Sequence, residues 1–112
     1  MNFINSDIST IAIGIAASMA SILLSSGTEG KRFALPHTRI LIHQPRGSVG
    51  GKSTEMEIDL KEMQTWRTSL YEILSEKMGK PMDEIEKLCK DDKWFSAKEA
   101  VDMKIIDKVI EK

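Results

Sequence analysis

Cysteine is almost absent from this sequence of 112 residues, and neither sign of charge is in excess. Because Cys89 is the single cysteine, a disulfide within the chain is excluded, and one thiol is compatible with a reducing compartment. Sixteen basic side chains stand against 17 acidic ones, so the chain lacks the basic surface that a nucleic acid requires. The 41% of hydrophobic residues excludes a fully disordered chain and predicts a folded core.

An export signal and a membrane-spanning run are also lacking. The most apolar stretch, residues 11–24, has 14 residues and includes two serines, so it is too short and too polar to cross a bilayer. The first basic residue is Lys31, which leaves no positively charged segment ahead of this stretch. We therefore expect a cytoplasmic protein with no membrane partner.

Charge is scarce in the first part of the chain. Residues 1–45 hold five of the 33 charged side chains, so this part is predicted to form the interior, and the remainder to form largely exposed helices. The length favours one domain, and no repeat or linker composition divides it.

Hydrophobic patterns predict alternating strands and helices. A β-branched strand is expected over residues 8–13 and a helix over 16–26, with Gly27 as the residue that ends this helix in a left-handed conformation. Two further strands are expected at 31–35 and 38–42. A strand, a glycine and then a helix make half of a βαβ unit, the arrangement that favours a parallel sheet.

The second half is predicted to be mainly helical. A long helix is expected over about residues 52–78 and is ended by Gly79 and Pro81, and a shorter helix is expected over 83–90. Ser96 and Glu99 have the spacing of a capping box that opens a last helix, and residues 105–110 suggest a closing strand. The fold class indicated is α/β.

Ser18 is the first candidate for chemistry. It lies where a strand gives way to a helix, among small residues that allow a substrate to come close. The start of a helix directs free N–H groups at an anion, so the N–H of Met19 is a candidate oxyanion donor. The alternative is a serine that is accepted there because it is small, or that caps the helix.

His43 and an acidic pair are the next candidates. His43 ends an apolar strand, at the edge of a parallel sheet where ligands bind, and could act as a general base toward Ser18. Asp91 or Asp92 could orient that imidazole. A histidine bonded to a backbone carbonyl and a pair of solvated or capping acids are the alternatives, and spacing alone favours them.

Metal and phosphate sites are not indicated. Two histidines and one cysteine in these contexts give no zinc spacing. The glycine-rich residues 46–51 do not place a Gly-Lys-Ser/Thr at the spacing after a strand that a phosphate-binding loop requires.

Four motifs follow one another in a specific order. They are G-I-A-A-S-M-A at 14–20, K-R-F-A-L-P at 31–36, R-I-L-I-H-Q-P at 39–45 and D-K-W-F-S-A-K-E-A at 92–100. In this order and spacing the chain closely resembles the proteolytic subunits of ATP-dependent Clp proteases, the ClpP family, over practically its whole length.

The resemblance implies a site and a fold. Ser18 would be the nucleophile, His43 the general base and Asp92 the orienting acid, in a chain order that differs from those of other serine hydrolases. Residues 1–112 would form a single ClpP-like domain, the carboxyl-terminal portion of the family domain. Its fold would be an α/β, ClpP/crotonase-like spiral of βαβ units with the long helix, about 52–78, as a handle.

The resemblance also implies an activity and partners. The expected activity is that of a serine endopeptidase that cleaves unfolded polypeptides through an acyl-enzyme. Family members form two stacked heptameric rings, and an AAA+ unfoldase that uses ATP feeds them, while the proteolytic subunit itself needs no metal or cofactor.

Two surfaces are implied in the same way. The segment of Gly47, Ser48, Val49 and Gly50 would lie along the substrate peptide. The unfoldase would dock on a set of apolar residues, namely Ile11, Ile13, Phe33, Leu35 and Ile110.

The chain also departs from the family pattern. By the resemblance, we expect the segment that precedes the position of Met1 in family members to be missing, including a glycine turn that gives the second oxyanion N–H, and we expect an unpaired sheet edge. Asp91 stands where the family has an arginine that pairs between rings, and Lys104 stands where it has a glycine. The alternative function is therefore a truncated, non-catalytic ClpP-like ring or regulatory subunit.

Overall fold

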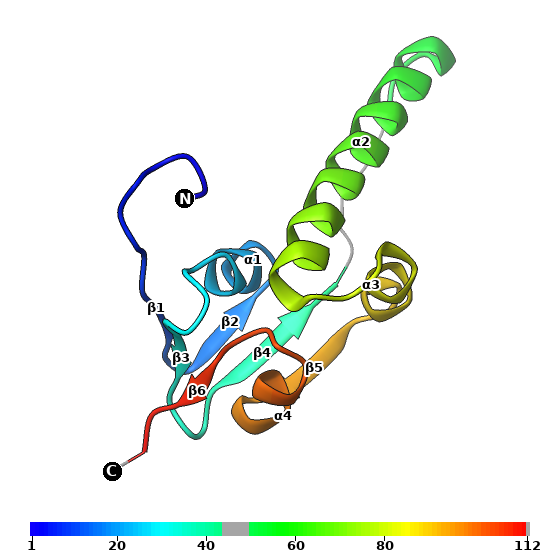
Figure 1. The fold of residues 1–112 in the computed structure, drawn as a ribbon. Coiled ribbons are helices and arrows are strands. Elements are labelled where there is room, and N and C mark those ends of the chain that lie inside the picture. Colours follow the sequence, from blue (N-terminus) through cyan, green and yellow to red (C-terminus); the bar gives the residue numbers. More distant parts are fainter. Residues whose placement is uncertain (44–49, 112) are drawn as a thin grey trace.

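The computed structural model describes residues 1–43 and 50–111 (Figure 1). Six strands and four helices alternate along this part of the chain, which confirms the α/β class. In chain order they are β1 (Thr10–Ala12), β2 (Ile15–Ala17), α1 (Met19–Ser25), β3 (Arg32–Ala34), β4 (Arg39–Ile42), α2 (Ser53–Met78), α3 (Met82–Cys89), β5 (Lys93–Ser96), α4 (Ala97–Asp102) and β6 (Lys108–Val109).

The strands form two three-stranded sheets. One has the order β1-β3-β6 and is parallel throughout. The other has the order β2-β4-β5, in which β2 and β4 are parallel and β5 runs antiparallel to β4. The predicted parallel arrangement is thus correct for all pairs except the one that includes β5.

Two strands differ from the sequence-based prediction. Residues 15–17 form β2, although the prediction began a helix at Ala16, and β5 was not predicted. Alanine favours helices, but pairing with β4 overrides this local preference at Ala16 and Ala17. The helix that follows is therefore shorter, Met19–Ser25 instead of 16–26.

Gly27 has a different role from the one predicted. Its backbone is not left-handed, and the last residues of α1 turn off through Ser26 in a right-handed conformation. A Cβ atom at Gly27 would lie 2.7 Å from Thr10 Oγ1, so glycine is needed because the turn passes close to β1.

The long helix agrees closely with its prediction. α2 covers Ser53–Met78 and ends at Gly79, whose φ of 63° is the left-handed conformation that glycine adopts easily. Its last turns bury Tyr71, Leu74 and Met78 against the body of the domain. Its first half projects away from that body, and the molecule measures 56 × 31 × 23 Å along its principal axes (Figure 1).

The remaining elements largely follow the sequence. α3 begins one residue before its predicted start, and the capping box of α4 is confirmed by reciprocal bonds between Ser96 and Glu99. The closing strand is limited to Lys108–Val109, because Ile105 and Ile106 are buried in the turn before it.

The core lies between the two sheets and the helices that pack on them. The inward positions of the strands carry Ala12, Ala16 and Ala34, whose small side chains let α1 contact β1, β2 and β3. Larger side chains fill the centre and are fully buried, among them Ile40, Ile42, Leu74, Met78, Ile85, Ile105 and Ile106.

One side of the molecule is apolar and open. Within residues 1–43 and 50–111, no strand pairs with the outer edges of β1 and β2, as the sequence comparison with the family predicted. Ile13 and Ile15 near these edges are 70% and 67% exposed. A long exposed edge with apolar side chains is a surface that folded proteins normally cover.

None of the helices described in this structure is both long enough and apolar enough to span a membrane.

Candidate active site

Ser18 forms a sharp turn between a strand and a helix. It follows β2 and immediately precedes α1, and its backbone has φ 57° and ψ −122°. A positive φ is unfavourable for a residue with a Cβ atom, by roughly 1–3 kcal/mol, and such residues cluster at functional sites. This geometry holds the hydroxyl at the tip of the turn instead of letting it cap the helix.

His43 meets Ser18 at the carboxyl edge of the sheet. The strands β2 and β4 are neighbours and parallel, with Ala17 opposite Leu41, so the residues that follow each strand lie close together. The Ser18 Oγ atom is 2.6 Å from His43 Nε2. This is hydrogen-bond distance for a serine nucleophile and its base.

Asp92 arrives at the same edge from the other side of His43. It immediately precedes β5, and because β5 is antiparallel to β4, its first residue lies at the end of β4, with Lys93 opposite Ile42. Continuing this register by one pair places Asp92 opposite His43. Three adjacent strands thus deliver a hydroxyl, an imidazole and a carboxylate to one edge, and the register favours Asp92 over Asp91.

Met19 is the first residue of α1, and its side chain is exposed. Its backbone N–H therefore belongs to the amino-terminal turn of a helix that starts next to the Ser18 hydroxyl. Helix termini of this kind carry partial positive charge and donors for an oxyanion.

The residues predicted to bind substrate lie mostly outside the described residues. Gly47, Ser48 and Val49 are among them, while Gly50 is described and exposed. Next to it, Gly51 has a φ of 95°, and its backbone passes beside Glu55, which accepts a hydrogen bond from Lys52 N at 3.2 Å. The substrate role of this segment stays a prediction.

The residues predicted to dock the unfoldase share one face. Ile11 lies opposite Phe33 in the register, and Ile13, Leu35 and Ile110 each follow directly after the last residue of β1, β3 or β6. The alternation of strand side chains would put them on the face turned away from Ala12 and Ala34. Each is at least partly exposed. Their docking role stays a prediction.

The two departures from the family pattern are both on the surface. Asp91 is exposed just before β5. Lys104 adopts a φ of 62°, so the turn keeps the left-handed conformation that a glycine would take, although the residue is lysine.

Cys89 is not part of the site. It is fully buried at the end of α3, and burial raises the pKa of its thiol to about 11. The thiol is therefore protonated and inert at neutral pH.

Sequence reasoning missed a buried ion pair that bonds to the carboxyl end of α1. Arg32 is 3% exposed and forms a salt bridge with Asp107, at 2.7 Å between Nη2 and Oδ1. The bond network around the Asp107 carboxylate, in which Arg32 contributes most, lowers its pKa. A charged residue at an inward position of an otherwise apolar strand was the signal in the sequence.

The structure thus places a serine hydroxyl and an imidazole within hydrogen-bond distance at a strand-to-helix turn of an α/β fold. Comparison with known proteins gives the family. The sequence profile of the Clp protease family matches residues 1–112. The chain therefore belongs to the Clp protease family.

The chain also matches a curated relative that is about twice as long. The chain is 47% identical over 112 residues to an ATP-dependent Clp protease proteolytic subunit of Porphyromonas gingivalis. The alignment covers 100% of this chain but 50% of the relative, so the chain spans about half the length of the curated relative that it matches.

Proposed function

We propose that this chain is a serine-type endopeptidase subunit of an ATP-dependent Clp-like protease. The observation that carries the proposal is the 2.6 Å approach of Ser18 Oγ to His43 Nε2 at the carboxyl edge of the sheet. The strained backbone at Ser18 and the register that places Asp92 beside His43 support it. Membership in the Clp protease family agrees with this chemistry.

The mechanism follows from the placement of these groups. His43 Nε2 removes the proton of the Ser18 hydroxyl as Oγ attacks the carbonyl carbon of a peptide bond. The N–H of Met19 donates to the oxyanion, and Asp92 holds the imidazole in orientation and stabilises its protonated form. His43 then protonates the leaving amine, and water hydrolyses the acyl-enzyme by the same proton transfers in reverse. No step requires a metal or a cofactor.

Substrate and partners are part of the proposal. Unfolded polypeptide would lie along the segment of Gly47 to Gly50, and an AAA+ unfoldase, which uses the ATP, would dock on the apolar face that includes Ile11, Phe33 and Ile110. The exposure of these side chains on a single sheet face supports this surface. The exposed first half of α2 supports its use as a handle between copies of the chain in a double heptameric ring.

A fluorophosphonate probe tests the catalytic assignment. Ser18 Oγ would bond to phosphorus as fluoride leaves and His43 takes the proton, so wild type becomes labelled and Ser18→Ala does not. His43→Ala is expected to reduce the labelling rate by a factor on the order of 10³ or more. The exposed Ser9→Ala and His37→Ala are matched controls and should label as wild type does. Absence of labelling in folded, assembled wild type contradicts the proposal.

A second candidate is a ring or regulatory subunit without peptidase activity. It is favoured by the outer edges of β1 and β2, which have no partner strand in the described part of the chain. Peptide hydrolysis by this chain alone that is lost in His43→Ala would exclude this candidate.

A further inference from the structure

Arg32 is a buried cation in a position that an apolar residue would usually occupy. It is the first residue of β3, its side chain is turned into the core, and it is 3% exposed. Removing a guanidinium from water is unfavourable by several kcal/mol unless its donors are all paired. A well-packed apolar pair would stabilise the fold at least as well. The contacts of Arg32 therefore deserve a specific explanation.

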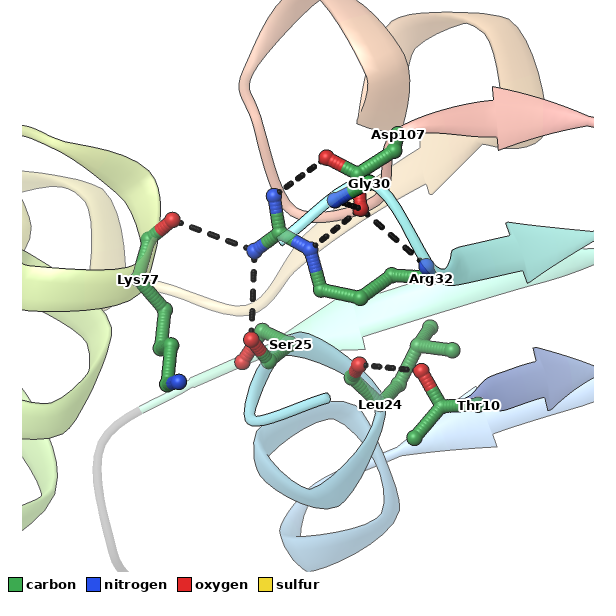
Figure 2. Close-up of polar contacts among 7 residues, drawn as sticks. All are labelled: Thr10, Leu24, Ser25, Gly30, Arg32, Lys77 and Asp107. Atoms are coloured by element: carbon green, nitrogen blue, oxygen red, sulfur yellow. Dashed lines mark hydrogen bonds and ion pairs between the residues drawn. The ribbon is translucent and has the colours of Figure 1, made fainter. Parts of the chain in front are cut away.

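All three nitrogens of the guanidinium donate hydrogen bonds, two of them to one carboxylate and the third to two helix ends (Figure 2). Nε and Nη2 donate to Asp107, at 2.9 Å to Oδ2 and 2.7 Å to Oδ1. Nη1 donates to two backbone carbonyls at once, those of Ser25 and Lys77, both at 3.1 Å. The Asp107 carboxylate also accepts from the N–H groups of Gly30 and Arg32, at 2.8 and 3.1 Å.

The two carbonyls belong to the ends of two helices. Ser25 is the last residue of α1, and Lys77 lies in the last turn of α2. Arg32 thereby ties the end of the long, projecting helix to the end of the short helix that begins beside Ser18. Thr10 adds a second anchor to α1, because its Oγ1 donates to the Leu24 carbonyl at 2.8 Å.

The shortness of α1 makes its anchors important. It has seven residues, and a helix of this length is not stable on its own, so it depends on its tertiary contacts. Its buried residues pack on the neighbouring strands, and the bonds of Arg32 and Thr10 fix its carboxyl end, opposite the end at Ser18. A shift at the carboxyl end moves the helix as a unit, and a displacement of 1 Å at the reacting group can lower a rate about 10²-fold.

We propose that Arg32 is a positioning residue that couples the carboxyl end of α2 to α1 and so holds Ser18 in line with His43. A change in the position of the long helix is then passed to the nucleophile through the guanidinium. The coupling rests on the proposed function for its effect on chemistry, but its structural part, a shared anchor for two helix ends, does not depend on catalysis.

The variant Arg32→Lys isolates this role. Lysine keeps a positive charge opposite Asp107, but its single nitrogen cannot bind the carboxylate and both carbonyls together. Arg39→Lys is the matched control, because Arg39 begins the strand β4 as Arg32 begins β3, and it is exposed. Thr10→Val is a milder second variant, which removes the bond to the Leu24 carbonyl with little change in shape.

The first measurement is the kinetics of labelling by the fluorophosphonate, resolved into its saturating rate and its half-saturating concentration. In folded samples, as judged by circular dichroism, Arg32→Lys should lower the saturating rate by a factor on the order of 10–10² and leave the half-saturating concentration near wild type. Thr10→Val should lower the same rate by a smaller factor, and Arg39→Lys should not change it. Saturating rates equal to wild type in Arg32→Lys and Thr10→Val overturn the inference.

The second measurement is amide hydrogen exchange, which separates this inference from the proposed function. Arg32→Lys should speed exchange in residues 19–26 and in residues 74–79 together, whereas Arg39→Lys should affect neither. If the wild-type protein is not labelled, the proposed function is wrong. Amide hydrogen exchange alone then tests whether Arg32 anchors the ends of α1 and α2. Exchange that is unchanged in both segments, or faster in one of them alone, contradicts the coupling.

Discussion

The backbone of Ser18 adopts a strained conformation that sets the position of its hydroxyl. Its positive φ places the hydroxyl at the tip of the turn, within 2.6 Å of His43 Nε2, and this conformation is unfavourable for any residue with a Cβ atom. The strain predicts that the backbone conformation that places the Ser18 hydroxyl for chemistry lowers the stability of the fold.

Ser18→Gly should therefore be more stable than Ser18→Ala, by about 1 kcal/mol. Both substitutions remove the hydroxyl and its contact with His43, so the difference between them isolates the backbone strain. Urea unfolding followed by circular dichroism measures the difference. Equal midpoints, or a less stable glycine variant, would show that the φ of Ser18 carries no strain.

Lys104 is the other non-glycine residue with a positive φ in the part of the chain that the structure describes. Lys104→Gly should raise the free energy of unfolding by about 1 kcal/mol, because the side chain is exposed and loses no buried contact. Lys90→Gly is the control, since Lys90 has a right-handed backbone at the end of α3, and glycine there should lower stability. A destabilised Lys104→Gly would contradict this account.

At the scale of elements, short segments decide the site, and they were the least predictable. The prediction of a helix from Ala16 failed because three residues, Ile15–Ala17, pair with β4 despite their helical preference. β5 was missed because its four residues carry no period that separates them from a loop. These two strands flank β4 and place Ser18 and Asp92 on either side of His43. The long helix, by contrast, could be predicted from its period and from Gly79.

The candidate residues themselves could be found in the sequence, but not their mutual geometry. Spacing along the chain left Ser18, His43 and Asp92 with ordinary structural alternatives, and the family motifs selected them. Strand order and register bring the three to one edge, and these depend on contacts between residues far apart in sequence. Their catalytic roles stay a prediction until labelling is measured.

The capping box of α4 should be a measurable part of the stability of this element. Ser96 Oγ accepts from Glu99 N at 3.1 Å, and Ser96→Ala should lower the free energy of unfolding by about 0.5–2 kcal/mol. Ser96→Thr retains a capping hydroxyl and should stay close to wild type. Urea titration distinguishes the two, and equal losses in both variants would contradict a capping role.

At the scale of the whole molecule, the Arg32–Asp107 pair makes stability depend on acid. Hydrogen bonds from Arg32 lower the pKa of Asp107 in the folded state. Its contribution to stability is therefore fully present above the unfolded pKa, about 4, and is lost as the pH falls through the lower, folded value. Unfolding measured between pH 7 and pH 2 should show this loss in wild type.

Asp107→Asn should remove that part of the acid dependence and should be destabilised at neutral pH by about 3–5 kcal/mol, because the buried guanidinium loses its counter-charge. Asp7→Asn is the matched control, since Asp7 pairs with Lys31 on the surface, where both side chains are at least half exposed. An unchanged acid slope in Asp107→Asn would show that other groups control the transition.

The projecting half of α2 has a consequence for how copies of this chain would join. The helix has 26 residues and would reach about 39 Å at 1.5 Å per residue, yet its buried side chains all lie in its last turns. Its outer turns have little tertiary support, and a helical segment shorter than about 12–15 residues is marginal in water without such support. A neighbouring copy that binds these turns must also order them as a helix. The cost of this ordering offsets part of the binding free energy of each contact. If copies assemble as proposed above, contacts between two copies would then be individually weak, and a closed ring, which holds every copy on both sides at once, would be far more persistent than any pair.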